Sequence, residues 1–304
     1  MMDIKFRKPT LADKDEIDYF FHKYPSRSCE RTFANIYLWS RKDPVTYGIV
    51  DKTLVFKREH KDSLAFTFPA GEPEDVKEAM KSLKKYANER NFPFVLYFVT
   101  PPQFAEIEEL YPGRFNIEYK RDVADYVYEY ETLEKLSGKK LHGKRNHINK
   151  FLINYEGRWS YERITEDNIE ECFQMALRWG RANGAYDDPE KNAELAVSLN
   201  SLRLFEELGF VGGLLRIEGQ VIAFTSGEAV TDDTFVVHIE KAMAFVEGAY
   251  PMINQQFVIN ECKDYKYINR EDDAGVEGLR IAKLSYKPAF LVEKGEVREN
   301  EDKE

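Results

Sequence analysis

The chain has no long hydrophobic run. Its 304 residues contain no stretch of the roughly 20 consecutive apolar residues that a membrane-spanning helix requires. The first residues, from Met1 to Phe6, also lack the apolar segment that is typical of a secretory signal peptide. We therefore expect no membrane span and a cytoplasmic location.

Cysteine is scarce, and the three cysteines lie far apart in the sequence, at Cys29, Cys172 and Cys262. An odd number at such distances forms neither a disulfide framework nor a zinc site. Cys172 and Cys262 fall on the apolar faces of expected helices. We interpret these cysteines as reduced and mostly buried thiols.

An excess of positive charge is also missing. The sequence has 44 Lys and Arg against 54 Asp and Glu, a formal net charge of −10. Such a protein repels nucleic acid at long range, so any contact with nucleic acid requires a local basic patch. A hydrophobic fraction of 43% with 14% aromatics is typical of folded globular chains, and the length predicts two domains.

Both halves of the chain show the same order of expected elements: strand, two helices, three antiparallel strands, helix, strand, helix and strand. This order is an architectural repeat and predicts an α/β fold with mixed sheets covered by helices. The expected strands are 4–6, 46–50, 53–58, 65–68, 94–99, 115–119 and 126–130 in the first half, and 158–163, 210–217, 220–229, 234–242, 265–269 and 284–292 in the second.

These patterns predict a domain organisation in four parts. We expect an N-terminal domain over residues 1–135, a basic helical connector over 136–157, a C-terminal domain over 158–292 and a disordered acidic tail over 293–304. The first domain has no comparable polar run at its matching strands. We therefore expect the second domain to carry the site, and the first to be a structural or substrate-binding copy.

Five blocks of the second half carry a resemblance to a known family. They read GKRNHINKF at 143–151, VHIEKA at 237–242, GAYPMIN at 248–254, YINREDD at 267–273 and GLRIAKLSYKP at 278–288. In these blocks the chain resembles a bacterial family related to the C-terminal domain of phosphatidylglycerol lysyltransferase, and its element order resembles the GNAT acyltransferase fold. The resemblance implies two tandem GNAT-like domains.

The resemblance also implies a reaction. In the lysyltransferases, such a domain pair moves an aminoacyl group from charged tRNA to a lipid head group. Two features of this chain depart from those enzymes, because it has no membrane span and it is acidic.

Coenzyme A is not expected as a cofactor. GNAT enzymes that use acyl-CoA resemble one another in a loop, Arg/Gln-x-x-Gly-x-Gly/Ala, whose backbone N–H groups bind the pyrophosphate at a helix N-terminus. The matching segment here is AFVEGAYPM at 244–252. Glu247 repels a diphosphate, and Tyr250 occupies the last small position, although Gly248 and Ala249 leave the backbone open to another ligand.

His238 and Glu240 alternate on one expected strand, so their side chains share a face. Together they could handle the proton of an attacking amine or hydroxyl, which makes them the candidate catalytic residues. The alternative is a buried polar pair that is satisfied by hydrogen bonds within the sheet.

The polar run at 269–273 directly follows an expected strand, where side chains reach ligands in α/β folds. Arg270 could bind a carboxylate or phosphate in bidentate fashion, and Asn269 could bind an amide or hydroxyl. Lys283 and Lys287 could stabilise an oxyanion, and Tyr250 completes the substrate-binding candidates. A solvated charged loop with exposed lysines is the alternative. The run lacks the spacing of a known Mg²⁺ loop, so we predict no metal.

One basic cluster stands out in this acidic chain, formed by Lys139, Lys140, Lys144, Arg145 and Lys150. It could contact the phosphates of tRNA, of a lipid head group or of a nucleotide. The alternative is pairing with acidic surface elsewhere in the protein.

The sequence therefore predicts an acyl or aminoacyl transferase with an amine or hydroxyl acceptor, with aminoacyl-tRNA as a possible donor. The alternative is a non-catalytic small-molecule-binding or sensor protein that keeps the fold.

Overall fold

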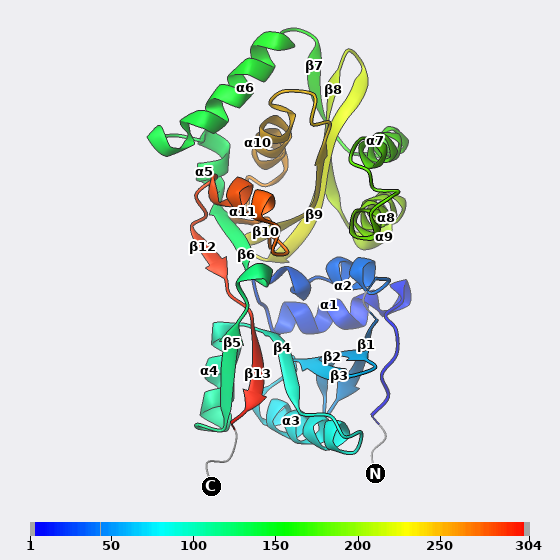
Figure 1. Ribbon diagram of the computed structural model, residues 1–304, viewed down its shortest axis with the longest axis vertical. Coiled ribbons are helices and arrows are strands. Elements are labelled where there is room, and N and C mark those ends of the chain that lie inside the picture. The colour runs from blue at the N-terminus through cyan, green and yellow to red at the C-terminus, as the bar shows by residue number, and fades with distance from the viewer. Residues whose placement is uncertain (1–3, 43, 301–304) are drawn as a thin grey trace. The chain divides into compact units, whose positions relative to one another are not determined.

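A computed structural model describes residues 4–42 and 44–300. The chain divides into two compact units, and each is built on one mixed β-sheet (Figure 1). The first unit contains the chain up to Asp125, residues 272–276 and the chain from Val292 onward. The second unit contains residues 126–271 and 277–291.

The first unit has a six-stranded sheet with the strand order β1-β2-β3-β4-β13-β5. Strands β1 to β3 are antiparallel, β3 and β4 are parallel, and β13 is antiparallel to both of its neighbours. Its elements are α1 (Lys14–Lys23), α2 (Phe33–Trp39), β1 (Val45–Val50), β2 (Thr53–His60), β3 (Ser63–Thr67), α3 (Pro73–Asn88), β4 (Val95–Val99), α4 (Pro101–Leu110), β5 (Phe115–Tyr119) and β13 (Gly295–Glu299).

Local sequence signals explain several of these boundaries. The expected hairpin turn is present between β1 and β2, where Asp51 and Lys52 both have positive φ, as a tight primed turn requires. Helix α4 begins with two prolines and is capped by Thr100 and Gln103, whose side chain accepts the Thr100 N–H. The strand expected at 4–6 is absent, since this segment forms only one bridge, from Arg7 to Tyr47.

The second unit has a seven-stranded sheet with the order β12-β6-β11-β10-β9-β8-β7. Helix α10 packs on one face and α7 on the other (Figure 1). Its elements are β6 (Asp125–Glu129), α5 (Tyr130–Lys135), α6 (His142–Asn154), β7 (Trp159–Arg163), α7 (Ile169–Ala182), α8 (Pro189–Arg203), α9 (Phe205–Leu208), β8 (Val211–Ile217), β9 (Gln220–Thr231), β10 (Thr234–Ala242), α10 (Ala249–Glu261), β11 (Tyr267–Asn269), α11 (Glu277–Leu284) and β12 (Phe290–Val292).

Each sheet contains one strand from the other half of the sequence. Strand β6 follows the first half but lies between β11 and β12, so the prediction that it completes the first sheet is wrong. Strand β13 follows the second half but lies between β4 and β5. The prediction of a disordered tail is wrong for its first part, because Gly295–Glu299 is an internal strand with Val297 in the core, and residues 301–304 lie outside the described residues.

A buried lysine accompanies this last strand. The Lys294 side chain is fully buried, and its ammonium lies 2.7 Å from Asp125 and 2.6 Å from Glu30. The acidic composition of the tail predicts that it is solvated. Its burial is compensated by the ion pairs of Lys294 and by the backbone hydrogen bonds that β13 forms with β4 and β5.

The fold class predicted from the sequence is confirmed: the protein is α/β, with two mixed sheets, one in each unit. The three cysteines are free thiols and are buried, as expected.

We predict that Lys294→Met destabilises the protein by about 3–5 kcal/mol, because Asp125 and Glu30 lose the cation that compensates their buried charge. Arg298→Met, on the strand that directly follows Lys294, is the matched control, since Arg298 is half-exposed and its ion pair within the described residues is with the neighbouring Glu296. That variant is expected to lose less than about 1 kcal/mol. Urea unfolding of both variants measures the difference, and equal losses would contradict the assignment.

Candidate functional site

The second sheet opens between β10 and β11. These strands are parallel and pair only over Thr234–Val236 with Tyr267–Asn269, after which β11 ends and β10 continues to Ala242. The pairing thus ends at the carboxyl end of β11, and α/β sheets bind their ligands beyond the carboxyl ends of parallel strands. The residues that follow on each strand are therefore the first place to look for a site.

A buried ion pair lies at this opening. Arg270 Nη2 donates to Glu240 Oε1 at 2.8 Å, and Asn254 Nδ2 on α10 donates to Glu240 Oε2 at 2.9 Å. The side chains of Arg270 and Glu240 are only 11% and 13% exposed. The carboxylate of Glu240 is thus fixed by two donors that come from different elements.

Aromatic rings and two amines surround this pair. The Arg270 guanidinium lies 4.8 Å from the ring centre of Tyr286 and 5.8 Å from that of Tyr128. On α6, Lys144 places its ammonium 4.0 Å from the centre of the Tyr286 ring. Lys283 on α11 donates to the Arg270 carbonyl oxygen at 2.6 Å, so it holds the backbone that presents Arg270.

Two polar atoms of the site are buried without a hydrogen-bond partner among the described residues. They are Arg270 Nη1, a donor, and Asn254 Oδ1, an acceptor. A buried unsatisfied polar atom costs about 1–3 kcal/mol, so native proteins keep few of them. A donor and an acceptor left open around one carboxylate favour a ligand that carries the complementary groups.

The charges of the site alter its pKa values. Burial lowers the pKa of Lys144 to about 8, and the neighbouring Arg270 charge acts in the same direction. Burial also raises the pKa of Tyr286 to about 12. Burial acts against the Arg270 cation, yet Glu240 keeps the pKa of Arg270 above its ordinary value. Lys144 therefore loses its proton at a lower pH than an ordinary lysine. Such shifted pKa values are common in functional sites.

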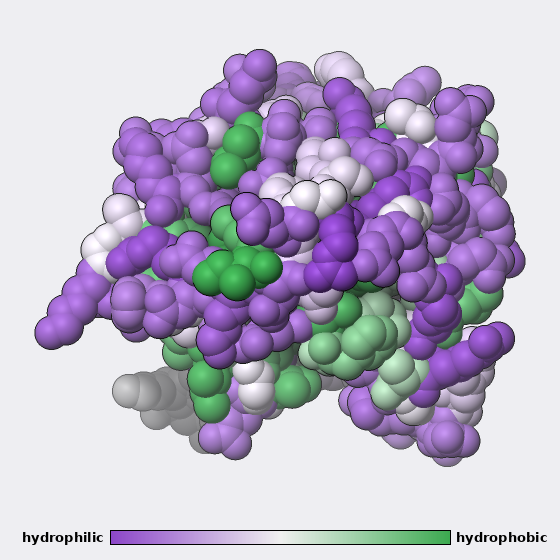
Figure 2. Space-filling view, turned by 90° about the horizontal axis from the view of Figure 1, so that it is seen from above, coloured by the Kyte–Doolittle hydropathy of each residue, from purple (hydrophilic) through white to green (hydrophobic). Residues whose placement is uncertain are grey.

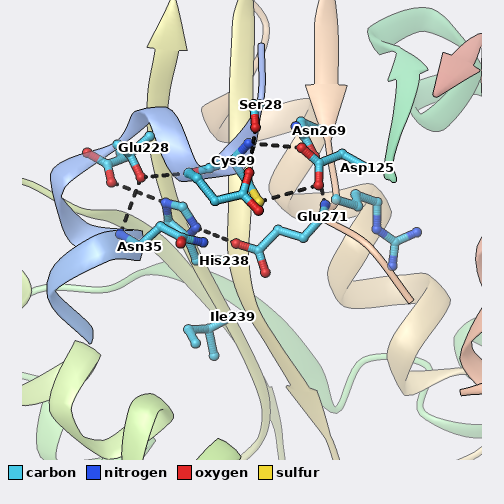
Figure 3. Close-up of polar contacts among 12 residues, drawn as sticks. Ser28, Cys29, Asn35, Asp125, Glu228, His238, Ile239, Asn269 and Glu271 are labelled. Atoms are coloured by element: carbon cyan, nitrogen blue, oxygen red, sulfur yellow. Dashed lines mark hydrogen bonds and ion pairs between the residues drawn. The ribbon is translucent and has the colours of Figure 1, made fainter. Parts of the chain in front are cut away.

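His238 has its own partners, which Figure 3 shows. Its Nδ1 lies 2.7 Å from Glu271 Oε1 and its Nε2 lies 3.1 Å from Glu228 Oε1. Burial opposes the charge of the imidazole, but the two carboxylates outweigh it and raise the pKa of His238 to about 9. The two carboxylates therefore favour the imidazolium form of His238, which carries no free nitrogen lone pair to accept a proton.

A bulge explains why the alternation argument fails to pair His238 with Glu240. The register of β10 against β9 shifts by one residue between Val237 and Ile239, so His238 is the additional residue. A bulge interrupts strict alternation and redirects side chains. The structure gives His238 and Glu240 different partners, and it groups Glu240 with Arg270 and Lys283.

The other substrate-binding candidates have mixed positions. Asn269 is fully buried, and its Oδ1 accepts the Glu271 N–H at 2.7 Å, which shapes the turn after β11. The Tyr250 hydroxyl accepts from Trp179 Nε1 at 3.2 Å, and burial raises the pKa of Tyr250. Lys287 is exposed and has a positive φ of 60°.

The sequence argument missed Asn254 and Tyr128, because both come from elements that only the fold brings to β10.

The basic cluster does not form one helical face. Lys139 and Lys140 are exposed on a 3₁₀ turn (Lys139–Leu141) before α6, while Arg145 donates to the carbonyl oxygens of Leu136 and Gly138. The remaining two lysines lie on α6: Lys144 is half-buried beside Tyr286, and Lys150 pairs with Glu247 at 2.7 Å. Two exposed lysines and one half-buried lysine thus remain for a ligand.

The segment expected to resemble a phosphate loop is packed against α6. A Cβ at Gly248 would lie 2.3 Å from the His147 carbonyl oxygen, and the Ala249 N–H already donates to Val246. Glu247 keeps its charge beside the start of α10, and Lys150 lowers its pKa. The helix N-terminus is therefore partly satisfied and carries a carboxylate, which disfavours a diphosphate.

The acidic residues after β11 are each engaged locally. The side chain of Asp272 accepts the Ala274 N–H, and the fully buried Asp273 accepts from Gly275 and lies 3.4 Å from Arg121. Both carboxylates therefore have partners within the first unit and in the turn itself.

A second cluster in the first unit resembles a metal site in its ligand types. Potential ligand atoms of Cys29, Glu30 and Asp125 lie within 4.8 Å of one another, and Figure 3 shows Cys29 beside Asp125. Lys294 Nζ lies 2.7 Å from Asp125 and 3.5 Å from Cys29 Sγ. The buried ammonium thus takes the place that a metal cation would need.

The surface shown in Figure 2 is mainly hydrophilic, with hydrophobic residues in separate patches. Strongly exposed apolar side chains include Ile153 at the end of α6 and Phe245 before α10. Throughout residues 4–42 and 44–300, the helices are too short or too polar to cross a bilayer.

Comparison with known proteins gives the family. The family described as "Phosphatidylglycerol lysyltransferase, C-terminal" matches residues 21–294, which is most of the sequence. The chain belongs to this family. The resemblance inferred from the sequence blocks is thereby confirmed.

Two solved structures are similar to this chain over nearly its whole length. A conserved protein of unknown function from Bacteroides thetaiotaomicron VPI-5482 is 37% identical, with a TM-score of 0.90 over 98% of this chain and 100% of that one. The structure of L-PGS from Bacillus licheniformis shares the fold, with a TM-score of 0.64 at 13% identity over 94% of this chain and 91% of that one.

A shorter match is found in Mycoplasmoides gallisepticum. An uncharacterized protein of that organism is 26% identical over 173 residues, which is 56% of this chain. The match spans about half of that relative, 54% of its length.

We predict that His238 makes stability depend on pH. Its folded pKa of about 9 lies above the ordinary 6.5, so its stabilisation is complete below pH 6.5 and is lost as the pH rises through 9. The difference corresponds to about 3 kcal/mol. Denaturant unfolding from pH 6 to 9.5 should show this decline, and His238→Gln should remove that part of it. The prediction is contradicted if the free energy of unfolding of His238→Gln falls with pH as steeply as that of the natural protein.

We also predict that acetyl-CoA binds weakly or not at all, because Glu247 and the packing of Gly248 on α6 disfavour a diphosphate at α10. Isothermal titration calorimetry measures the affinity directly. A dissociation constant in the low micromolar range would show that the prediction is wrong.

Proposed function

We propose that the protein is an aminoacyl transferase, with its active site at the opening between β10 and β11. The observation that carries the proposal is the open donor on Arg270 and the open acceptor on Asn254, on either side of the Glu240 carboxylate. An aminoacyl ester carries the matching groups, a carbonyl oxygen that accepts and an ammonium that donates. Family membership supports the same class of reaction.

Each side chain then has a role. Arg270 Nη1 donates to the carbonyl oxygen and stabilises the oxyanion that develops during attack. Asn254 Oδ1 accepts from the ammonium of the aminoacyl group. Glu240 keeps a free lone pair on each oxygen and receives the proton of the acceptor amine or hydroxyl.

The reaction is balanced. The acceptor oxygen or nitrogen forms a bond to the carbonyl carbon while its proton passes to Glu240. The ester bond to the donor then breaks, and the leaving hydroxyl takes the proton from Glu240. His238, held as an imidazolium between two carboxylates, is assigned to positioning Glu271 and the turn that carries Arg270.

The donor that we propose is aminoacyl-tRNA. The exposed Lys139 and Lys140 offer charge to tRNA phosphates, and Lys144 offers a cation beside the site itself. The acceptor class is an amine or hydroxyl. The cytoplasmic location expected from the sequence stays a prediction.

The test is transfer of a labelled aminoacyl group. Purified protein is incubated with tRNA charged with radiolabelled lysine or alanine, and with phosphatidylglycerol vesicles or small amines as acceptors. We predict that Glu240→Gln lowers the transfer rate by roughly 10²-fold or more, because the amide keeps the hydrogen bonds but cannot take the proton.

Glu171→Gln is the control, since Glu171 pairs with Arg216 at the surface of the same unit and is expected to leave the rate unchanged. Unfolding midpoints of both variants separate lost chemistry from lost stability. A Glu240→Gln variant with the full rate would overturn the role of Glu240. Binding of charged tRNA without any transfer would favour the sensor alternative.

A further inference from the structure

The first unit contains a small cavity that the proposed reaction does not use. It lies where the parallel strands β3 and β4 end, the same sheet position that forms the site of the second unit. Its volume is about 30 Å³, room for about two water molecules. The lining residues are Phe21, Ser26, Ser28, Glu30, Arg31, Leu54, Phe56, Thr67, Phe68, Phe98, Thr100 and Gln103.

Arg31 is the charged group of this cavity that lacks a partner. Within the described part of the chain its guanidinium makes no hydrogen bond or ion pair, and its neighbour is the Phe21 ring at 5.5 Å. A guanidinium has five N–H donors, and leaving them unpaired in a partly buried position is unfavourable. Burial accordingly lowers the pKa of Arg31 to about 10.

The acidic residues nearby compensate this charge only in part, because Glu30 and Glu106 act on it through space and form no ion pair with it. Glu30 is bound by Lys294 at 2.6 Å and accepts from the Ser28 hydroxyl at 2.5 Å. Glu106 acts on Arg31 only through space, and burial raises the pKa of Glu106. A net positive group therefore faces the cavity.

The rest of the wall decides which anion fits. Thr100 and Gln103 bond to each other in the cap of α4, and the first two residues of α4 are prolines without N–H groups. Arg31 is thus the main donor. The rings of Phe21, Phe56 and Phe98 supply an apolar surface beside it. A planar carboxylate matches the guanidinium fork, and a single methyl group matches the rings within this small volume.

We propose that this cavity binds the carboxylate of a small organic acid of about the size of acetate, with Arg31 as the bidentate partner and the aromatic wall against its methyl group. The site lies within the first unit and is independent of the transfer site. It gives the first unit a ligand of its own.

The test measures binding to the full chain. Thermal unfolding is followed with formate or acetate up to 50 mM, against sodium chloride and phosphate at equal ionic strength. At tenfold excess over the dissociation constant, we expect one of these acids to raise the midpoint by about 3 °C. Calorimetry then gives the stoichiometry, expected as one acid per chain.

Two variants assign the effect to Arg31. Arg31→Met should abolish the rise, and Arg31→Lys should weaken it, because lysine keeps the charge but not the fork. Glu240→Gln should keep the rise in full, so failure of the transfer proposal does not affect this test. The proposal is overturned if no acid exceeds chloride, if phosphate stabilises more than every acid, or if Arg31→Met responds as the natural protein does.

Discussion

The early end of the parallel pairing between β10 and β11 is the constraint on which the second unit depends. Beyond Val236 and Asn269 the strands no longer share hydrogen bonds, so the side chains that follow must satisfy one another. Glu240 and Arg270 do this across the opening, and Asn254 on α10 completes the arrangement. Because the opening is partly buried, each charge needs a partner, and the atoms left open point to a ligand.

Each unit contains a buried basic side chain that lies between two carboxylates from other segments of the chain. His238 lies between Glu228 and Glu271, and Lys294 lies between Glu30 and Asp125. Such pairs add little net stability relative to apolar packing, but losing one partner is costly. They therefore fix the register of the strands that carry them.

The exchange of β6 and β13 links the two halves of the sequence. Neither half contains all strands of its own sheet, because each sheet takes one internal strand from the other half. A fragment ending near residue 137 would lack β13 and leave the edges of β4 and β5 open. Without β13, the facing edges of β4 and β5 would expose their backbone donors and acceptors. We therefore infer that the chain folds as a whole.

The sequence by itself determined the α/β class, the repeat of two units, most strand positions and the family, because periodicity, turn residues and motif blocks are local properties. It also pointed to Glu240 and Arg270, since polar residues after buried strands stand out. Only the tertiary structure decided that His238 is held apart by a bulge, that Asn254 joins Glu240, and that Lys294 is buried. Those outcomes depend on register and on strand exchange between halves, which are set by long-range packing that no local pattern encodes.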